Sequence, residues 1–452
     1  MEKYYKRYIE KTIIDNLHSS GAILVSGPKF CGKTTTCMRF QKSFIKLNTS
    51  EKIMLANLNP KGILAGERPR LIDEWQKAPE LWNEVKDDLD FDYQFGKYIL
   101  TGSATPPDKR GIHHSGAGRI YPMVMKPMSL FESLESNGKV SLLDLFNNNQ
   151  KYDFDLNSNF TLDDITRLVC RGGWPVAVLS KKEYSINVTK GYYKNIFTFD
   201  ESENDYFKSL NPDILYMVLK SYAKNISTEA TKSSMISDII ANNNRTMSED
   251  TFDKYLKALN DLFIIEDINA WNPNIRSKTS IRTTPTRHFI DTSIACCALN
   301  ISPSDFMNDM KSFGYFFEDF AIRDLSIYAS VYNGEIRHYR DNSGAEVDAI
   351  VHLEDGRWGA IEIKVGGEKL INEGLNSLRL FKEKIIKKSD EKAPSFMMVL
   401  TAFGPLYKTR DGIYVVPINM LKDWLRIKEL ISLFFFLFFY EIWSSFIILV
   451  YY

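Results

Sequence analysis

The residues from Gly27 to Thr34 have the types and the spacing of a phosphate-binding loop. The run GPKFCGKT fits the pattern G-x-x-x-x-G-K-[ST] at every fixed position. It follows the apolar run Ala22–Ser26 and precedes a segment of helical character, which is the context that such a loop requires. Its glycines let backbone N–H groups wrap phosphates, and the following helix adds its positive end. The motif predicts binding of ATP or a close relative.

Two residues of this loop have specific expected roles. Lys33 is expected to reach the β- and γ-phosphates, and the Thr34 hydroxyl is expected to coordinate Mg²⁺. ATP and Mg²⁺ are therefore the predicted cofactors. The predicted nucleotide-binding set is Gly27, Pro28, Lys29, Phe30, Cys31, Gly32, Lys33, Thr34 and Thr35.

A second motif, which carries two acidic residues, supports the P-loop assignment. The run Leu71-Ile72-Asp73-Glu74 is an apolar strand that ends in two carboxylates. Asp73 is expected to hold Mg²⁺ through water, and Glu74 is expected to polarise the attacking water as the catalytic base. Such a run is weak evidence alone, but downstream of a P-loop it predicts hydrolysis of the nucleotide.

Two further residues are candidates for the same site. The strand Tyr98–Thr101 leads to Ser103, which is expected to sense the γ-phosphate between the other two strands. Arg119, in the run HSGAGR, is a candidate arginine finger, and the alternative is an ordinary structural arginine. A finger that acts on a neighbouring subunit requires a homo-oligomer, whereas one that acts within the chain does not.

Near the C-terminus, Asp348, Glu362 and Lys364 form a second candidate site. A loop at Glu354–Gly356 would pair position 348 with position 362 and place Gly356 where positive φ is needed. The strands expected on either side of this loop are Glu346–His352 and Trp358–Lys364. Lys364 then shares a strand face with Glu362. Two carboxylates and a lysine suit metal-assisted phosphodiester hydrolysis with Mg²⁺ or Mn²⁺, and Glu318 on a preceding helix could add a carboxylate. The alternative is a surface hairpin with alternating charges.

The elements that must position these residues can be outlined from the apolar pattern. Strands that alternate with helices predict a parallel α/β sheet with its working edge at the strand carboxyl ends. The polar stretch 135–160 indicates a linker or an exposed insertion. A helix capped by Ser248 and a strand at Ile264–Ile268 precede a segment, 268–290, that has basic residues and no acidic ones. This layout is typical of a winged helix that binds nucleic acid, and the alternative is a packing module with a solvated basic loop. The basic residues are Arg276, Lys278, Arg282 and Arg287.

Composition limits the remaining classes. Lys and Arg number 57 and Asp and Glu number 57 in the 452 residues, so no general field attracts nucleic acid or membrane. Five cysteines without metal-site spacing, and an N-terminus without a signal-peptide pattern, predict a cytoplasmic protein. The apolar run 430–452 is long enough to span a bilayer, so membrane association through it is one reading, and an extension past the last domain is the other.

Several motifs, in the order in which they occur, resemble those of a large family of prokaryotic AAA-type ATPases. The family joins an N-terminal P-loop domain to a C-terminal domain of unknown function. The motifs are PRLIDEWQKAPELWNEVK, YILTGSATP, HHSGAGRIYPMVMKPMSLFE, RGGWP, SEDTFDKYLKAL, FGYFFEDFAIRDL, YRDNSGAEVDAIV and WGAIEIKVGG. The resemblance covers about residues 1–425. It departs in two places, since the stretch between Leu58 and Leu71 is short and the tail lies beyond the last motif.

The resemblance implies an α/β fold in several parts. These are a P-loop AAA-type parallel sheet domain, a helical and winged-helix middle, and an α/β C-terminal domain similar to the PD-(D/E)xK, restriction-endonuclease-like nucleases. In that frame Ser103 takes the sensor 1 position of AAA-type ATPases. Asp348, Glu362 and Lys364 match the nuclease motif, and Glu318 matches its helical acid. The expected divisions are 1–130 (ATPase), 131–220 (linker and helical lid), 221–300 (winged helix), 301–428 (nuclease-like) and 429–452 (tail).

The sequence thus predicts an ATPase whose nucleotide state controls a C-terminal module that acts on DNA. A second hypothesis makes the nuclease-like module the main activity, licensed by nucleotide binding. A third makes the chain a signalling scaffold whose C-terminal domain binds a protein and does not cut.

Overall fold

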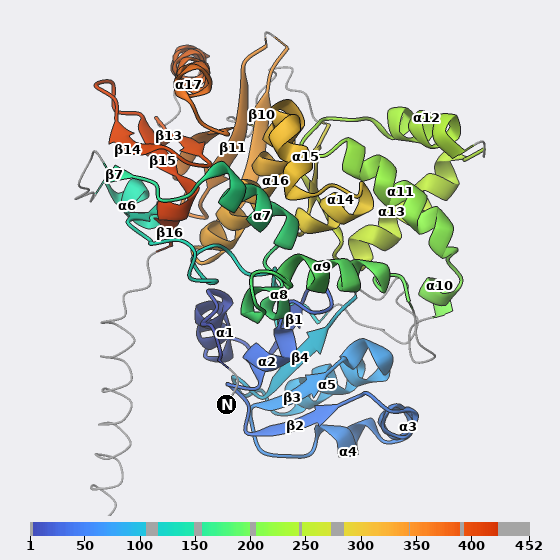
Figure 1. The fold of residues 1–452 in the computed structure, drawn as a ribbon. Coiled ribbons are helices and arrows are strands. Elements are labelled where there is room, and N and C mark those ends of the chain that lie inside the picture. Colours follow the sequence, from blue (N-terminus) through green and yellow to red (C-terminus); the bar gives the residue numbers. More distant parts are fainter. Residues whose placement is uncertain are drawn as a thin grey trace, which may run out of the picture.

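The computed structural model describes residues 3–104, 116–148, 156–198, 205–243, 246–272, 284–342, 344–388 and 393–423. The chain forms an N-terminal α/β region, a helical region and a C-terminal α/β region (Figure 1). In Figure 1 the N-terminal region lies below, with the helical region and the C-terminal sheet above it.

The N-terminal region is built on a parallel sheet of five strands. Its order is β2-β3-β4-β1-β5, with every neighbouring pair parallel. The strands are β1 (Ala22–Ser26), β2 (Ser43–Lys46), β3 (Arg70–Asp73), β4 (Tyr98–Gly102) and β5 (Ile120–Val124). Because β4 lies between β1 and β3, the carboxyl ends of these three strands meet at one edge. The predicted parallel sheet is confirmed.

Both faces of this sheet are buried, which is why its strands consist of apolar runs rather than of alternating residues. On one face Ile23 and Val25 join the main core, whereas Ala22 on the other face joins a second core with residues of α5, Val85 and Leu89. Helices α1 (Ile9–Leu17), α2 (Lys33–Cys37), α3 (Ser50–Leu58), α4 (Pro60–Leu64) and α5 (Glu80–Phe91) belong to this region. Helix α2 has only 5 residues, so it contributes only a short helix dipole to the loop before it.

Helices dominate the middle of the chain. They are α7 (Leu162–Arg171), α8 (Pro175–Leu179), α9 (Ser185–Lys194), α10 (Asp205–Lys208), α11 (Pro212–Lys224), α12 (Lys232–Asn243), α13 (Glu249–Asp261), α14 (Ser293–Ala298) and α15 (Pro303–Asn308). The Ser248 side chain caps α13 by accepting a hydrogen bond from Thr251 N, as predicted. Strands β8 (Ile265–Ile268) and β9 (Thr286–Phe289) pair antiparallel, so helices followed by a two-stranded ribbon are present.

The basic segment between β8 and β9 is only partly described. Arg276, Lys278 and Arg282 lie outside the described residues. Arg287 is buried, forms an ion pair with Asp267 and donates hydrogen bonds to the carbonyl of Ala230. Its guanidinium is therefore engaged inside the protein, which corrects the expectation that it belongs to a solvent-facing basic wing.

The stretch predicted as a linker also contains regular structure. Within 135–160, strand β6 (Val140–Ser141) pairs with β16 (Leu421–Lys422) near the end of the described chain. Helix α6 (Leu142–Asn147) follows β6, and strand β7 (Leu156–Asn157) pairs with β14 (Pro405–Lys408). This stretch is thus attached to the C-terminal sheet, a long-range pairing that its polar composition did not reveal.

The C-terminal region contains a mixed sheet with the order β10-β11-β12-β13-β15-β14-β7. Its strands are β10 (Glu335–Arg340), β11 (Glu346–His352), β12 (Trp358–Lys364), β13 (Phe396–Thr401), β14 (Pro405–Lys408) and β15 (Tyr414–Pro417). The β10–β11 and β11–β12 pairs are antiparallel, whereas β12, β13 and β15 run parallel. The bounds of β11 and β12 are those predicted from the sequence.

Two long helices cover the two faces of this sheet. Helix α16 (Met310–Ser330) shares the main core with Ala349 and Ile361, whereas helix α17 (Glu368–Lys388) shares a separate core with Ile350 and Ala360. The alternation along β11 and β12 therefore divides their side chains between α16 and α17.

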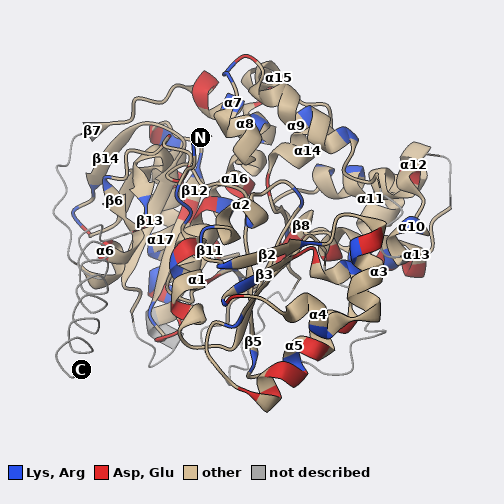
Figure 2. Ribbon diagram, turned by 90° about the horizontal axis from the view of Figure 1, so that it is seen from below, with Lys and Arg blue, Asp and Glu red and all other residues tan. Residues whose placement is uncertain are grey.

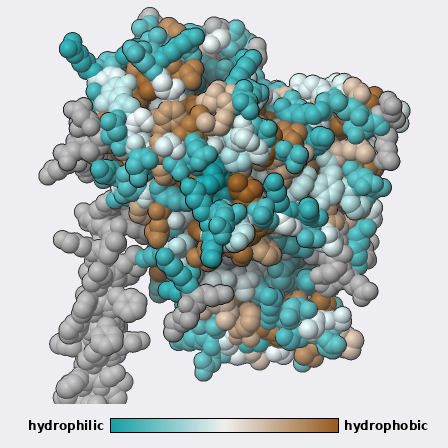
Figure 3. All heavy atoms as spheres, viewed as in Figure 1, coloured by the Kyte–Doolittle hydropathy of each residue, from teal (hydrophilic) through white to brown (hydrophobic). Residues whose placement is uncertain are grey.

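Charged and apolar side chains are mixed over the surface. Figure 2 shows Lys and Arg interspersed with Asp and Glu, for example along α5. On the face in Figure 3, hydrophobic residues form separate small groups among hydrophilic ones. No helix within the described ranges has the length and apolar character needed to cross a membrane. The apolar run 430–452, for which membrane association was one of two readings, lies outside those ranges.

Candidate nucleotide-binding site and C-terminal charged cluster

The P-loop connects the carboxyl end of β1 to the start of α2, as the sequence predicted. The Lys33 side chain is buried, and its Nζ donates to the carbonyl oxygens of Gly27 and Pro28, each at 2.8 Å. The loop therefore wraps the ammonium group with its own carbonyls. This places the positive charge inside the loop that is predicted to receive phosphates.

Gly27 is required where the loop leaves β1. Its φ is 147°, and a Cβ at this position would lie 2.2 Å from the Met125 carbonyl oxygen. The segment after β5 runs directly behind the loop here, since Met125 N donates to Ser26 O at 2.7 Å. Only a residue without a side chain allows this approach.

Asp73 lies beside Thr34 at the predicted Mg²⁺ position. Both Thr34 Oγ1 and Thr101 Oγ1 donate to Asp73 Oδ1, at 2.7 and 2.5 Å. The Asp73 side chain is 1% exposed, and in the described structure its Oδ2 has no hydrogen-bond donor, with Lys46 Nζ at 3.8 Å. A buried carboxylate oxygen without a donor, next to a threonine hydroxyl, fits the oxygen ligands that a hydrated Mg²⁺ uses. These residues therefore suit the ion.

Glu74 is held from two sides at the end of β3. Ser103 Oγ donates to Glu74 Oε2 at 3.0 Å, and Gln76 Nε2 donates to the same oxygen at 2.5 Å. Gln76 Nε2 also lies 3.3 Å from Ser103 Oγ, so each of these three side chains contacts the other two. The backbone of Glu74 has a φ of 63°, which turns its side chain out of the strand direction.

Thr101 and Gln76 were not identified from the sequence. Thr101 occupies the last part of β4 beside Asp73, and Gln76 follows Glu74 by two positions. The run DEWQ places Gln76 close to Glu74 in the sequence, but a glutamine that follows a strand has many possible partners. Only the tertiary structure shows that it contacts Glu74.

Arg119 lies away from this site. Its carbonyl accepts from Ala22 N at the amino end of β1, the edge of the sheet opposite to the P-loop. Its guanidinium forms an ion pair with Asp90 at the end of α5. Arg119 therefore does not face the P-loop of its own chain in this structure. The expectation of a finger that reaches a neighbouring subunit stays a prediction.

Aromatic side chains of the helical region cover one side of the P-loop. Phe30, with a φ of 71° and 58% exposed, contacts the Tyr192 ring of α9 at a centroid distance of 5.8 Å. Tyr192 in turn packs on Trp174 at 4.4 Å. A Cβ at Gly32 would lie 3.4 Å from Pro175 Cγ. The run RGGWP thus reaches the nucleotide site, which its sequence did not indicate.

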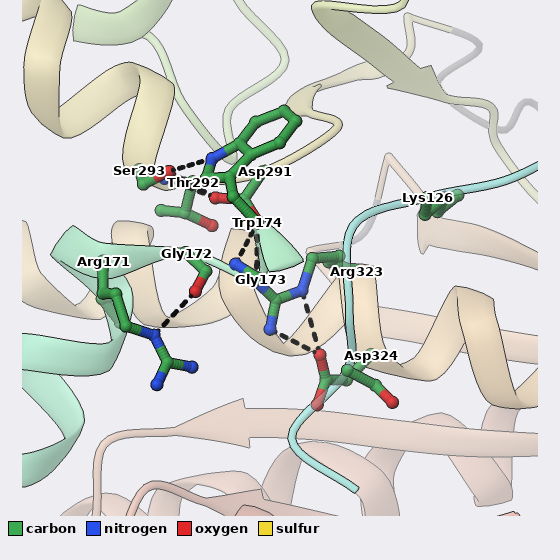
Figure 4. A network of polar contacts seen from close by, with 12 residues as sticks. Lys126, Arg171, Gly172, Gly173, Trp174, Asp291, Thr292, Ser293, Arg323 and Asp324 are labelled. Atoms are coloured by element: carbon green, nitrogen blue, oxygen red, sulfur yellow. Dashed lines mark hydrogen bonds and ion pairs between the residues drawn. The ribbon is translucent and has the colours of Figure 1, made fainter. Parts of the chain in front are cut away.

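A buried polar network joins the three regions (Figure 4). Arg323 of α16 forms ion pairs with Asp291 at 2.9 Å and with Asp324 at 2.7 Å. Asp291 Oδ2 also accepts from Gly173 N at 2.8 Å, and Asp324 Oδ2 accepts from Leu130 N at 2.8 Å. The helical region, the C-terminal helix α16 and the segment after β5 are therefore fixed to one another.

The RGGWP turn fits this network closely. Gly172 ends α7 with a φ of 73°, and a Cβ there would lie 2.2 Å from Asp291 Oδ1. Trp174 Nε1 donates to Ser293 Oγ at 3.0 Å, and Arg171 binds the Glu135 carboxylate through two nitrogens, at 2.5 and 2.6 Å. A two-point arginine contact fixes orientation as well as distance.

In the C-terminal region, Asp348, Glu362 and Lys364 converge as predicted. Lys364 Nζ lies 3.1 Å from Asp348 Oδ2 and 2.6 Å from Glu362 Oε2. Ser377 Oγ of α17 donates to Glu362 Oε1 at 2.9 Å, a contact that the sequence did not reveal. The β11–β12 register pairs Ala349 with Ile361, which is the predicted alignment. The φ of Gly356 is 83°, also as predicted.

Burial sets the charge properties of this cluster. It raises the pKa of Glu362 to about 8, with Asp348 adding to the shift and Lys364 opposing it. It also raises the pKa of Glu318 well above its usual range, with Asp348 as the next cause, which places Glu318 beside the cluster. Burial alone would lower the pKa of Lys364, but Asp348 and Glu362 outweigh it and raise that pKa.

The predicted metal-ligand set Glu318, Asp348 and Glu362 is not formed. Among the residues that the structure describes, no group of three or more His, Cys, Asp or Glu side chains could hold a metal ion. The Lys364 ammonium lies between the carboxylates of Asp348 and Glu362 and forms an ion pair with each. The cluster is a pair of acids bridged by a lysine.

The fold and the nucleotide site are those of a P-loop α/β domain, and three segments of the chain match family models. Residues 19–134 match the family described as an AAA domain. Residues 313–421 match a domain of unknown function, DUF4143, and residues 162–305 match another, DUF8612. The N-terminal region is therefore similar to AAA domains, and the C-terminal region is similar to DUF4143 domains.

Whole-chain relatives and solved structures are also similar. An uncharacterized protein of Mycobacterium tuberculosis and one of Mycobacterium bovis are each 24% identical over 438 residues, which covers 92% of this chain and 84% of each relative. The solved structure of a Walker-type ATPase of Pyrococcus abyssi is similar at 14% identity and a TM-score of 0.42. It covers 66% of this chain and 97% of that one.

Proposed function

We propose that the chain binds ATP with Mg²⁺ at the P-loop and hydrolyses it to ADP and phosphate. The observation that carries this proposal is the convergence of Lys33, Asp73 and Glu74 at one edge of the parallel sheet. Bound Mg²⁺ would supply charge neutralisation for the phosphates.

Each side chain has a distinct task in this proposal. Lys33 exchanges its loop carbonyl partners for phosphate oxygens, which keeps its charge satisfied in both states. Asp73 and Thr34 offer oxygens to the ion. Glu74 accepts a proton from the attacking water, and Ser103 holds the Glu74 carboxylate in place.

The test compares three variants of the full chain in ATP turnover and ATP binding. Glu74→Gln should bind ATP with wild-type affinity and lower kcat by about a hundredfold or more, because it removes the base and keeps the shape. Lys33→Ala should lose binding. Glu80→Gln, a carboxyl-to-amide change at an exposed residue of α5, is the matched control and should act as wild type. Normal turnover in both Glu74→Gln and Lys33→Ala would contradict the proposal.

We further propose that the ATP-binding region controls a C-terminal module that acts on DNA. The convergence of Asp348, Glu362 and Lys364 favours this function, because a lysine between two acids can orient water or balance charge on a phosphodiester. The rival is a switch whose C-terminal domain binds a protein without cutting nucleic acid.

Incubation of the full chain with plasmid DNA, ATP and Mg²⁺ or Mn²⁺ distinguishes these functions. Nicking that is lost in Lys364→Ala and kept in Lys369→Ala, a nearby exposed lysine of α17, would support action on DNA. ATP turnover that ignores DNA, without any nicking, would support the protein-binding switch.

A further inference from the structure

A buried arginine from the N-terminal segment contacts the P-loop, although it lies well before the loop in the sequence. Arg7 precedes α1 and is 4% exposed. Its Nη1 donates to the carbonyl oxygen of Cys31 at 2.9 Å, and its Nη2 donates to the carbonyl oxygen of Lys126 at 2.6 Å. One guanidinium therefore joins the loop to the segment after β5.

Buried carboxylates hold Arg7 in this position. Its Nε lies 3.2 Å from Glu132 Oε1, in an ion pair between two buried side chains. Glu132 Oε1 also accepts from Tyr8 N at 2.7 Å, and Glu132 Oε2 accepts from Ser129 N at 2.8 Å. The backbone N–H of Arg7 donates to Glu10 Oε1 at 2.7 Å. The protein itself thus fixes the guanidinium before any ligand binds.

The contact with Cys31 sets the direction of one peptide group of the loop. The peptide bond between Cys31 and Gly32 is trans, so its C=O and its N–H point in opposite directions. Because the carbonyl is directed toward Arg7, the Gly32 N–H is directed away from it. Within the described ranges this N–H donates to no other group.

This direction needs support, because a glycine follows the carbonyl. Gly32 has a φ of 99°, and glycine rotates about φ at little steric cost. A flipped peptide would present an oxygen where the loop needs an N–H, and an oxygen repels phosphate. The hydrogen bond from Arg7 to the Cys31 carbonyl opposes that flip.

We propose that Arg7 is a positioning residue that directs the Gly32 N–H onto a phosphate oxygen, an inference that rests on the proposed nucleotide function of the P-loop. Arg7 does not touch the phosphates, since it binds the carbonyl on the other side of the same peptide. Its charge also polarises that peptide, which strengthens the N–H as a donor. The planar guanidinium holds the carbonyls of Cys31 and Lys126 together, a geometry that a lysine ammonium does not reproduce.

Binding of ATP and of inorganic tripolyphosphate to the full chain, measured by calorimetry, tests this role. Arg7→Lys keeps a positive charge beside Glu132 and loses the two-carbonyl contact. It should weaken both ligands by about ten- to a hundredfold, the range for loss of a hydrogen bond to a charged group. The kcat at saturating ATP should stay within about threefold of wild type, because Arg7 does not contact Glu74.

Arg287→Lys is the matched control. Arg287 is also buried, forms an ion pair with Asp267 and donates to a backbone carbonyl, that of Ala230, but it lies in the helical region. Both variants should lose stability in urea denaturation without ligand, whereas only Arg7→Lys should lose affinity. A second measurement needs no variant: selective isotope labelling of glycine amides should show that tripolyphosphate slows hydrogen exchange of the Gly32 N–H in wild type.

The outcomes separate the role of Arg7 from the nucleotide function. If wild type binds neither ligand, the nucleotide function fails and the role of Arg7 fails with it. If wild type binds both and Arg7→Lys keeps full affinity, only the role of Arg7 is overturned. Equal affinity losses in Arg7→Lys and Arg287→Lys would also overturn it, because they would indicate an effect of general stability. If Arg7→Lys does not fold, unchanged exchange of the Gly32 N–H on tripolyphosphate binding would refute the proposal.

Discussion

Removal of the Ser103 hydroxyl tests the proposed arrangement around the catalytic base. Ser103 Oγ and Gln76 Nε2 both donate to Glu74 Oε2, at 3.0 and 2.5 Å. A hydrogen bond to a charged group contributes about 1.5–3 kcal/mol, so its loss corresponds to roughly a ten- to hundredfold effect. We expect Ser103→Ala to lower kcat by about tenfold or more and to leave ATP affinity unchanged, because Ser103 contacts the base and not the loop.

The same geometry predicts how two substitutions combine. Ser103 and Gln76 share one acceptor oxygen and also lie 3.3 Å from each other, so their effects cannot be independent. The double variant Ser103→Ala/Gln76→Ala should lose less than the sum of the single losses, with a coupling energy of about 1 kcal/mol.

Phosphate release at saturating ATP gives kcat, and equilibrium binding of ATP gives the affinity for all four members of the cycle. Ser237→Ala, an exposed hydroxyl on α12, should match wild type. Full additivity of the two losses, or a drop in ATP affinity as large as the drop in kcat, would refute the idea that both side chains act through Glu74.

Three further predictions concern the loop, the buried network and the C-terminal cluster. Gly27→Ala should abolish ATP binding, because its Cβ would collide with the Met125 carbonyl, and calorimetry that shows intact binding would contradict the loop geometry. Asp291→Asn should lower the free energy of unfolding by about 3 kcal/mol in urea denaturation, since it removes a charge partner of buried Arg323, and a change below 1 kcal/mol would speak against it. Burial raises the pKa of Glu362 from 4.5 to about 8, so between these pH values the unfolded chain ionises Glu362 more readily than the folded chain, and the free energy of unfolding falls as pH rises. Glu362→Gln removes this loss and should therefore raise the melting temperature more at pH 8 than at pH 5. Equal shifts at the two pH values would contradict this reasoning.

The elements predicted correctly are those that carry their signal locally. Strand β11 was predicted with its observed bounds because its side chains alternate between two cores. Helix α13 was found because one apolar stripe follows a capping serine. The register of β11 and β12 follows from one short loop, so three sequence positions were sufficient to align Asp348 with Glu362.

The elements that were missed depend on the rest of the molecule. Strand β5 contains Pro122, which argues against a strand, but β5 lies at the sheet edge, where a missing N–H is tolerated. Strand β2 is a four-residue edge strand with partly exposed side chains and no clear period. The contacts of Gln76 with Glu74 and of Ser377 with Glu362 join separate elements, and no local pattern specifies them.

Helix α16 connects the two candidate sites through one rigid element. Glu318 lies beside the C-terminal cluster, and Asp324, six residues later, binds Leu130 N in the segment that passes behind the P-loop. Six residues of helix span about 9 Å, so Asp324 and Glu318 lie close together on one helix. If this helix moves as a rigid rod, a shift of the segment after β5 moves the cluster by about the same distance as the segment itself. Spatial continuity alone does not establish coupling, because coupling is a free energy and is reciprocal. If ATP strengthens DNA binding by some factor, DNA must strengthen ATP binding by the same factor, and Asp291→Asn should reduce both factors together. Equal ATP affinity with and without DNA in wild type would show that α16 is only a structural support.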